Sequence, residues 1–309
     1  MGTIIQVVPT LFYIAITTMK ISKLSIFTLF FIIIATQAMK SQPSQTITPI
    51  KESAHTIFDF AQQDFTYQNR NYRLYIAVPK TEHSNTPSPI LYMMDGNGQF
   101  PMLINQVDSV NANSAIVVGI GYPNHEAYPK ERTRDYTTPS QDNSQGGGAE
   151  AFYNFIVTEV KPYIESHYNI DTTHQTLCGH SFAGLFTLYV MLHHTTDFQH
   201  YVSASPSLWW DKGAVVPNSR PLFAHKPTSI TITLGEYEEN PQDDPARKNL
   251  SPKLIAQKDA RVGGISAREL HAIIANEVDN SKFIIYKGEN HGSSIRPFLK
   301  DAWSEASRK

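Results

Sequence analysis

Short apolar runs alternate with polar stretches along most of the chain, and the runs have the length of strands. Such runs over 90–94, 114–121, 230–234 and 282–286 predict strands, each ending at a polar or glycine-containing turn. Segments with helical spacing lie between several of them. Strands that alternate with helices predict an α/β fold with a mostly parallel central sheet flanked by helices.

The helical segments are recognised by apolar residues at three- and four-residue steps. Residues 149–168 show this spacing, and Pro162 within them predicts a bend or the start of a second helix. A further helix is expected before residue 277, and another over 295–303. The apolar face of the first of these two consists of Leu270, Ile273, Ile274 and Val278.

The region before residue 90 has a different pattern. Strand-like runs over 56–60 and 72–78 flank a polar segment, and residues 67–70 read as a turn. This arrangement predicts an N-terminal antiparallel hairpin. The polar stretch over 122–148 is rich in Pro, Gly and Asn, and loops of that length are usually functional.

The N-terminal end has the features of a secretory signal peptide. Lys20 and Lys23 precede an apolar run over 24–34, and small residues suited to cleavage end at Ala38. The run is too short for a clear membrane span. We expect Met19 to be the true start and cleavage to follow Ala38.

These boundaries divide the chain into three parts. Residues 1–38 are expected to be the signal peptide, 39–52 a flexible lead-in, and 53–309 a single domain. The protein would then be periplasmic or secreted. The alternative is an uncleaved signal that anchors the N-terminus in a membrane, which also places the domain outside the cytoplasm.

Composition narrows the possible partners. The formal net charge of −2 over 309 residues offers no basic field for nucleic acid. Cys178 is the single cysteine, so no intramolecular disulfide can form. Because Cys178 ends a predicted buried strand, we interpret it as a structural thiol and not as a nucleophile.

The stretch GHSFAGL, which follows that strand and precedes an apolar helix, predicts a nucleophile elbow. Gly179, Ala183 and Gly184 are small enough for the backbone segments to pass each other, although the usual pattern has glycine where Ala183 stands. The turn would present the Ser181 hydroxyl at the top of the sheet. It would also aim the Phe182 backbone N–H at a developing oxyanion.

A histidine after the last predicted strand is the expected catalytic base. His291 lies between Asn290 and Gly292, downstream of Ser181. The chain order of serine, acid and histidine is that of the α/β hydrolases. An imidazole at this place can accept the serine proton and return it to a leaving alcohol.

The acid is expected just after the strand that ends at Gly235. Glu238 is our prediction, because it stands three residues beyond that strand end. Glu236 and Glu239 are alternatives of equal charge, and Asp211 is a more distant one. The alternative is that these glutamates form a solvated acidic loop without a catalytic role.

A second oxyanion donor is expected at the turn after the strand over 90–94. The sequence there is Asp-Gly-Asn-Gly, and the backbone N–H of Gly96 or Asn97 is the predicted donor. The alternative is an ordinary turn stabilised by the aspartate side chain.

The other histidines suggest neither a metal site nor a cofactor. We expect His180 to pack beneath the elbow, because its side chain points away from that of Ser181. His193 and His194 are adjacent on a helix and face different directions, with no further ligand set in the sequence.

Seven blocks of sequence carry a resemblance that spans almost the whole of the expected domain. They are ILYMMDGNGQF at 90–100, RTRDYTTP at 132–139, GGGAEAFYNFIVTEVKPYIESHYNID at 146–171, GHSFAGLFTLY at 179–189, SASPSLWW at 203–210, LGEYEENP at 234–241 and GENHGSS at 288–294. With these blocks the chain resembles the putative-esterase family of α/β hydrolases. Within that family it is similar to the esterases of trilactone siderophores, which act on enterobactin, salmochelin or bacillibactin. Some of those relatives use a Ser–His dyad without an acid.

The resemblance implies a serine esterase that forms an acyl-enzyme on Ser181 and acts on a siderophore of catecholate trilactone type. Trp209 and Trp210 offer flat apolar faces on which catechol rings could stack, although either could instead pack in the core. Arg134 could bind a substrate carbonyl or phenolate, or could pair with Asp135. The alternatives are a secreted carboxylesterase for feruloyl or acetyl esters, and a binding protein without catalytic activity.

Overall fold

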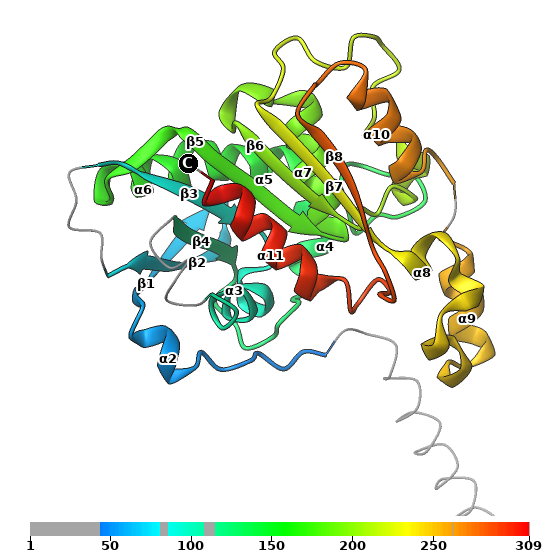
Figure 1. Ribbon diagram of the computed structural model, residues 1–309, viewed down its shortest axis with the longest axis horizontal. Helices are drawn as coiled ribbons and strands as arrows, with labels where there is room; N and C mark the ends of the chain where they lie inside the picture. Colours follow the sequence, from blue (N-terminus) through cyan, green and yellow to red (C-terminus); the bar gives the residue numbers. More distant parts are fainter. Residues whose placement is uncertain (1–43, 81–85, 108–114, 262, 309) are drawn as a thin grey trace, which may run out of the picture. The chain divides into compact units, whose positions relative to one another are not determined.

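The computed structural model describes residues 44–80, 86–107, 115–261 and 263–308, all of which lie in one compact unit. Its centre is an eight-stranded sheet in the order β1-β2-β4-β3-β5-β6-β7-β8. Strands β4 to β8 in this order run parallel, and the β1–β2 hairpin is antiparallel to its neighbour β4. The predicted α/β fold with an N-terminal antiparallel hairpin is therefore confirmed (Figure 1).

The strands are β1 Phe58–Tyr67, β2 Arg70–Pro79, β3 Ser88–Met93, β4 Ile116–Gly121, β5 Ile170–His180, β6 His200–Ala204, β7 Ser229–Gly235 and β8 Ser281–Tyr286. The α-helices are α2 Glu52–His55, α3 Gly96–Ile104, α4 Glu131–Tyr136, α5 Ala149–Phe155, α6 Lys161–His167, α7 Phe182–His193, α8 Glu236–Glu239, α9 Pro252–Asp259, α10 Ala267–Ala275 and α11 Ile295–Ala306. Short 3₁₀ turns, among them Trp210–Gly213, lie between several of these elements.

The hairpin turn explains why β1 and β2 are longer than the apolar pattern suggested. Gln68 and Asn69 both have positive φ, at 48° and 60°. A two-residue turn of this kind matches the right-handed twist of the flanking strands. It lets ten residue pairs form between Phe58 and Tyr67 on one side and Arg70 and Pro79 on the other.

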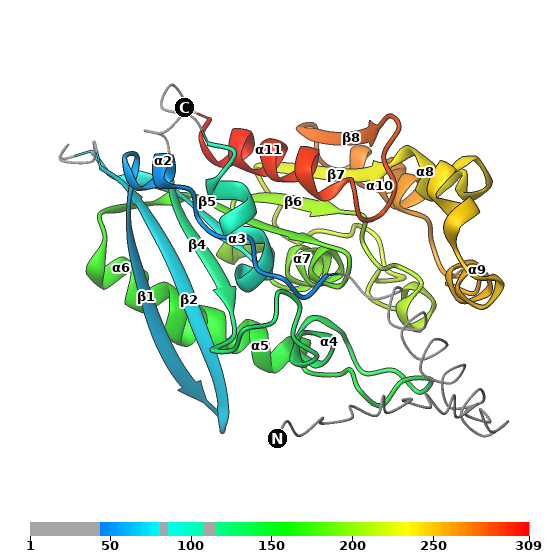
Figure 2. The same ribbon diagram turned by 90° about the horizontal axis from the view of Figure 1, so that it is seen from below.

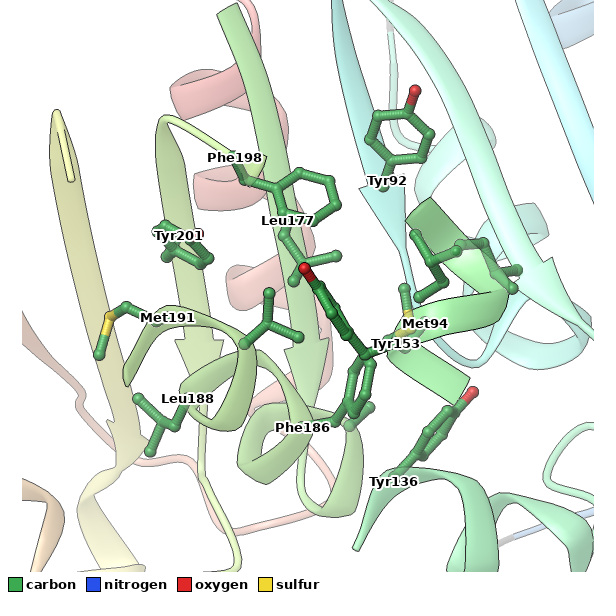
Figure 3. Close-up of a cluster of buried hydrophobic side chains, with 14 of the residues drawn as sticks. Tyr92, Met94, Tyr136, Tyr153, Leu177, Phe186, Leu188, Met191, Phe198 and Tyr201 are labelled. Carbon is green, nitrogen blue, oxygen red and sulfur yellow. The ribbon is translucent and has the colours of Figure 1, made fainter. Parts of the chain in front are cut away.

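Helices cover both faces of the sheet (Figures 1 and 2). Strand residues alternate between the two faces, so most strands supply side chains to two separate apolar layers. One layer lies under α3 and α11 and includes Leu91, Met93 and Phe298. The other lies under α5, α6, α7 and α10, and Figure 3 shows part of it, with Leu177, Phe198 and Tyr201 from the sheet side facing Phe186 and Leu188 of α7.

The predicted long helix over 149–168 is present but is interrupted near its middle. A π-helical segment, Ile156–Val160, connects α5 to α6 just before Pro162. A proline has no N–H to donate to the preceding turn, and a π segment is one way for a helix to absorb that loss.

Three elements were not expected from the pattern. Strand β6 is only five residues long and lies between longer neighbours. Helix α3 begins directly at Gly96, where only a glycine-rich turn was expected, and α4 forms inside the predicted long loop. Both helices are short or contain glycine and proline, so helical periodicity gave little signal.

The described part of the lead-in is bonded to the domain. The Gln45 carbonyl accepts the Ala127 N–H at 3.0 Å, and the Gln45 side chain accepts the Tyr128 N–H at 2.9 Å. The Lys51 N–H donates to the side chain of Asn105 at 2.8 Å. Residues 45–51 of the expected lead-in thus contact the domain through their backbone and the Gln45 side chain, and the flexibility of the lead-in stays a prediction.

The predicted signal peptide and the first residues of the lead-in lie outside the described residues. Among the residues that the structure describes, no helix is long and apolar enough to cross a membrane.

Candidate active site

Ser181 sits in a strained turn between β5 and α7. Its backbone has φ 64° and ψ −120°, a conformation that costs a non-glycine residue on the order of 1–3 kcal/mol. Two hydrogen bonds hold the turn, because the Ser181 N–H donates to the Ala204 carbonyl at 2.9 Å and the Leu185 N–H donates to the Ser181 carbonyl at 2.9 Å. The predicted nucleophile elbow is present as a backbone feature.

The small residues around Ser181 are required by close backbone contacts. A Cβ added at Gly179 would lie 2.4 Å from the Ala183 carbonyl oxygen, and one added at Gly184 would lie 2.6 Å from the carbonyl oxygen of Ala204. Ala183 itself fits because its Cβ fills the space that Gly179 leaves open. Alanine in place of the usual glycine is thus accommodated.

His291 lies beside Ser181, although 110 residues separate them. The distance from His291 Nε2 to Ser181 Oγ is 3.0 Å. The loop after β8 holds the ring in place, because the Asn290 side chain accepts the N–H groups of Gly292 and Ser293 at 3.1 and 3.2 Å. The structure therefore brings together the predicted nucleophile and the predicted base.

Glu238 lies on the other side of His291. Its Oε2 is 2.6 Å from His291 Nδ1, and its Oε1 accepts the Gly235 N–H at 2.9 Å and the Ser205 hydroxyl at 2.5 Å. Burial raises the pKa of Glu238, but the neighbouring His291 and these hydrogen bonds outweigh burial and lower it to about 2. The carboxylate is ionised at neutral pH and can only accept hydrogen bonds. Consequently His291 Nδ1 donates, and Nε2 of the neutral ring is free to accept the Ser181 proton.

The other candidate acids are engaged elsewhere. Glu236 accepts the Gly288 N–H at 2.7 Å, and Glu239 forms a two-point ion pair with Arg268 at 2.8 Å. Glu238 occupies the position behind His291 Nδ1, which leaves no such role for Asp211. All four carboxylates were open alternatives in the sequence, and the structure selects Glu238.

His180 packs beneath the elbow, as expected, and extends the network behind the triad. It is 4% exposed, and its ring centre is 4.7 Å from that of His291. Burial, followed by the nearby His291, lowers the pKa of His180 to about 3, so the ring is neutral. Ser294 bridges this ring to the triad, because its hydroxyl is 3.4 Å from His180 Nε2 and 3.3 Å from the hydroxyl of Ser205.

The expected oxyanion donors occupy the ends of adjacent strands. Strand β3 pairs with β5, and the Met94 N–H donates to the Cys178 carbonyl at 3.1 Å, so α3 and α7 start side by side. The first N–H groups of a helix have no partner within it, which applies to Gly96 and Asn97 in α3 and to Phe182 in α7. The Asn97 side chain faces away to bond the backbone of residue 122 at 2.8 Å, so only its main chain is available.

Two arginines of α4 are held in ion pairs. Arg134 binds both carboxylate oxygens of the buried Asp135, at 2.7 and 2.9 Å, and its side chain is 32% exposed. This pairing is the alternative to a role in substrate binding that the sequence left open. Arg132 binds both oxygens of Asp95 at 2.7 Å and is nearly buried.

The two tryptophans have different environments. Trp210 is 2% exposed, packs edge-on against Phe182 and donates its indole N–H to the Thr138 carbonyl at 2.9 Å. The prediction that Trp210 offers a stacking face is therefore wrong, because its ring is enclosed by the core. Trp209 is half-buried, lies 5.6 Å from the Phe182 ring and has the Arg261 guanidinium 5.3 Å above it. For Trp209, a stacking face for an aromatic substrate stays a prediction.

Cys178 is buried, and burial raises the pKa of its thiol, as expected of a structural cysteine. His193 bonds the Val215 carbonyl at 2.9 Å, and His194 bonds Glu150 at 3.0 Å. In the described part of the chain, no cluster of three or more His, Cys, Asp or Glu side chains is placed to hold a metal ion.

Sequence reasoning missed the serines that line the triad. Ser207 Oγ lies 3.3 Å from Ser181 Oγ, and the Ser207 N–H donates to the Ser181 carbonyl at 3.2 Å. Ser205 supports Glu238 from a strained backbone with φ 44°. Both belong to the block SASPSLWW, for which only the tryptophans were predicted to have a role. The position of this block near a strand end could have indicated that its serines lie at the site.

An eight-stranded mostly parallel sheet, an elbow after β5 and a Ser–His–Glu line at the carboxyl ends of β5, β8 and β7 define an α/β-hydrolase fold. The sequence pattern of the family described as "Putative esterase" matches residues 66–253, more than half of the chain. The chain belongs to this putative-esterase family.

Curated relatives and solved structures agree with this assignment. The chain is 30% identical to the ferri-bacillibactin esterase BesA of Bacillus subtilis over 258 residues, which cover 75% of this chain and 83% of that protein. It is 28% identical to the siderophore triacetylfusarinine C esterase of Aspergillus fumigatus, over 67% of this chain and 77% of that protein. The siderophore hydrolase EstA of Aspergillus nidulans superposes with a TM-score of 0.72 at 21% identity, covering 86% and 99% of the two chains, and supports the fold alone.

Proposed function

We propose that the protein is a serine esterase that hydrolyses carboxylic esters through an acyl-enzyme on Ser181. The observation that carries the proposal is the unbroken line from Ser181 Oγ to His291 Nε2 at 3.0 Å and from His291 Nδ1 to Glu238 Oε2 at 2.6 Å. A nucleophile, a base and an acid that orients the base are the three parts this chemistry needs.

The proposed reaction has two halves. Ser181 Oγ attacks the ester carbonyl carbon while its proton moves to His291 Nε2. The tetrahedral intermediate then collapses, the bond to the alcohol oxygen breaks, and the imidazolium returns its proton to that oxygen. In the second half a water molecule loses its proton to His291 and attacks the acyl carbon. The bond from that carbon to Ser181 Oγ then breaks, the acid is released, and His291 returns the proton to Ser181 Oγ.

Glu238 has a defined part in this sequence. Its carboxylate faces the ring nitrogen that gains no proton, so it stabilises the imidazolium and fixes the ring orientation without becoming protonated. With a pKa of about 2, it stays ionised throughout the pH range in which such an enzyme would act. The backbone N–H of Phe182 and that of Gly96 or Asn97 are the proposed donors to the oxyanion.

We further propose an ester-linked siderophore, of the catecholate trilactone type, as the substrate. Support comes from curated relatives described as esterases of siderophores, including one for ferri-bacillibactin and one for apo-salmochelin. On this chain, the partly buried ring of Trp209 beside Phe182 gives an aromatic wall near the serine on which a catechol could stack. The second candidate remains a carboxylesterase for feruloyl or acetyl esters, which the same aromatic wall would also suit.

A hydrolysis panel separates these substrates. Purified protein is offered enterobactin, salmochelin and bacillibactin, each with and without iron, together with methyl ferulate and p-nitrophenyl acetate. We expect the trilactones to have a kcat/KM at least tenfold above that of the simple esters. A preference for the ferulate or the acetate would reject the siderophore assignment and keep the esterase.

The same assay tests for catalysis itself. Ser181→Ala should abolish turnover of p-nitrophenyl acetate and leave the fold intact, because the elbow accommodates a smaller side chain. A wild-type protein that binds siderophores but turns over no ester would instead be the binding protein considered from the sequence.

We also propose that the enzyme acts outside the cytoplasm, in the periplasm or after secretion. The support is the signal-peptide pattern between Lys20 and Ala38, which lies outside the described residues. A siderophore enters a cell from outside, so an esterase exported to meet it is chemically consistent with this location.

A further inference from the structure

Arg132 in α4 lies between the two turns that carry the proposed oxyanion donors. Its Nε and one terminal nitrogen each donate to a carboxylate oxygen of Asp95 at 2.7 Å. Its guanidinium carbon also lies 5.7 Å from the centre of the Phe182 ring. The Arg132 side chain is 13% exposed and that of Asp95 is fully buried. A single side chain thus contacts both halves of the site.

Asp95 needs to be held, because its backbone is left-handed, with φ 55° and ψ 39°. That conformation costs a residue with a Cβ about 1–2 kcal/mol. Besides Arg132, the Tyr136 hydroxyl holds it by accepting the Asp95 N–H at 3.0 Å. Tyr136 is itself fully buried, and its ring centre lies 5.4 Å from that of Phe152 and 5.9 Å from that of Phe186. Figure 3 shows Tyr136 near Phe186 of α7. Helix α4 therefore forms hydrogen bonds with both the carboxylate and the main chain of Asp95.

The conformation of Asp95 sets the direction of the N–H groups that follow it. Its carbonyl accepts the Gly98 and Gln99 N–H groups at 3.1 and 2.9 Å, which starts α3. The N–H groups of Gly96 and Asn97 come before the first bonded turn and project from the helix start. A rotation of the Asp95 backbone would change the direction of both groups.

We propose that Arg132 is a positioning residue for the oxyanion site, which it orients by locking Asp95 in the left-handed conformation and by packing on Phe182. The inference rests on the proposed esterase function. Arg132 is not assigned a charge effect on the substrate, because its positive charge is matched by the two-point pair with Asp95. Its contribution is geometric, and a misplacement of about 1 Å can cost on the order of a hundredfold in rate.

The first test is Arg132→Lys, which keeps the charge but cannot bind both carboxylate oxygens in one plane. We expect kcat for p-nitrophenyl acetate to fall about 10- to 100-fold with KM nearly unchanged, since the loss falls on the transition state. The matched control is Arg73→Lys, which breaks a similar two-point pair with Asp64, at 2.6 and 2.7 Å, on the N-terminal hairpin. The control should keep its rate.

A second measurement distinguishes positioning from general damage to the fold. Trifluoroacetophenone adds to Ser181 as a hemiketal whose oxygen carries the negative charge, whereas the neutral amide acetanilide binds as a substrate analogue that carries none. In Arg132→Lys the affinity for trifluoroacetophenone should fall by the same factor as kcat/KM, while the affinity for acetanilide stays unchanged. An equal loss of affinity for both ligands would show that Arg132 has only a structural role and would overturn the proposal.

A double-mutant cycle tests whether Arg132 acts through Asp95. Arg132→Gln alone leaves a buried carboxylate without its partner and is expected to destabilise the fold, so it is combined with Asp95→Asn. If the two residues act as one unit, the double variant should be no slower than the slower single variant. Independent, additive losses would contradict the mechanism. Absence of turnover in the wild-type protein, or its retention in Ser181→Ala, would instead reject the esterase function on which the inference rests.

Discussion

The Nδ1 atom of His291 lies 2.6 Å from Oε2 of Glu238, and 53 residues separate the two along the chain. The pair is supported from behind, because the second oxygen of Glu238 accepts hydrogen bonds from Gly235 and Ser205. An acid held by these two donors can orient a histidine more firmly than a solvated surface carboxylate can. This favours a Ser–His–Glu triad over a Ser–His dyad for the proposed esterase.

Glu238→Gln is expected to lower kcat by about two to four orders of magnitude and to leave KM nearly unchanged, since an amide neither fixes the required tautomer nor stabilises the imidazolium. Steady-state kinetics with a trilactone or with p-nitrophenyl acetate measures this. Glu236→Gln and Glu239→Gln are the matched controls, being neighbours of equal charge that do not contact His291. A loss smaller than about tenfold at Glu238 would indicate a Ser–His dyad.

The nucleophile and the base should behave as one unit. Ser181→Ala and His291→Ala are each expected to reduce kcat by a similar large factor, and the double variant should be no slower than either, because removing one partner already disables the other. Single-turnover and steady-state rates of the three variants test this. A double variant that is much slower than both singles would show that the two residues act separately.

The two tryptophans should respond differently to truncation. Trp209→Ala is expected to raise KM for aryl esters about 2- to 10-fold, because it removes the partly buried ring beside Phe182 and an aromatic contact is worth roughly 0.5–1.5 kcal/mol. Trp210→Ala should instead lower the free energy of unfolding by about 3–5 kcal/mol, since it empties a buried site. Kinetics on aryl and alkyl esters and urea unfolding distinguish the two. Equal KM changes in both variants would refute the division.

Glu305 in α11 should make the stability of the domain depend on pH. Burial raises the pKa of its carboxyl, but hydrogen bonds from His200 and Ser229 and the charges of Arg308 and Lys282 lower it to about 2, against a usual 4.5. Because the folded pKa is depressed, the stabilisation is present above pH 4.5 and is lost as the pH falls through about 2. Glu305→Gln should therefore be less stable than wild type at pH 7.

The check is urea unfolding of wild type and Glu305→Gln over a range of pH. The difference between their free energies of unfolding should shrink steadily below pH 4.5. Glu269→Gln is a control on the surface, where the carboxylate caps its own helix at Ser266. A difference that is constant with pH would mean that Glu305 acts by packing and not by charge.

Export can be tested at the N-terminus. When the full chain is expressed in a bacterial host, the exported protein should begin near Met39, because the small residues that end at Ala38 form the expected cleavage site. N-terminal sequencing of the periplasmic or secreted fraction decides the matter. A protein that stays in the cytosol and keeps its first residue would reject the prediction.

The sequence by itself determined the fold class and two parts of the site. Apolar runs of strand length alternate with segments of helical spacing, and such elements bury their apolar faces by forming a parallel sheet covered by helices. Ser181 was identified because a strand-to-helix turn tight enough to present a serine requires small residues at fixed offsets, here Gly179 and Gly184. His291 followed from its place after the last strand. Each of these signals lies within a few residues along the chain.

Only the tertiary structure decided the parts that depend on side-chain direction across distant segments. Glu236, Glu238 and Glu239 are equivalent in sequence, and the start of α8 at Glu236 determines that Glu238 turns back to the strand end and to His291. Burial separates Trp209 from Trp210, although the two are adjacent. A local pattern specifies which faces are apolar, but it does not specify which side chains meet when strands far apart in the chain become neighbours in one sheet.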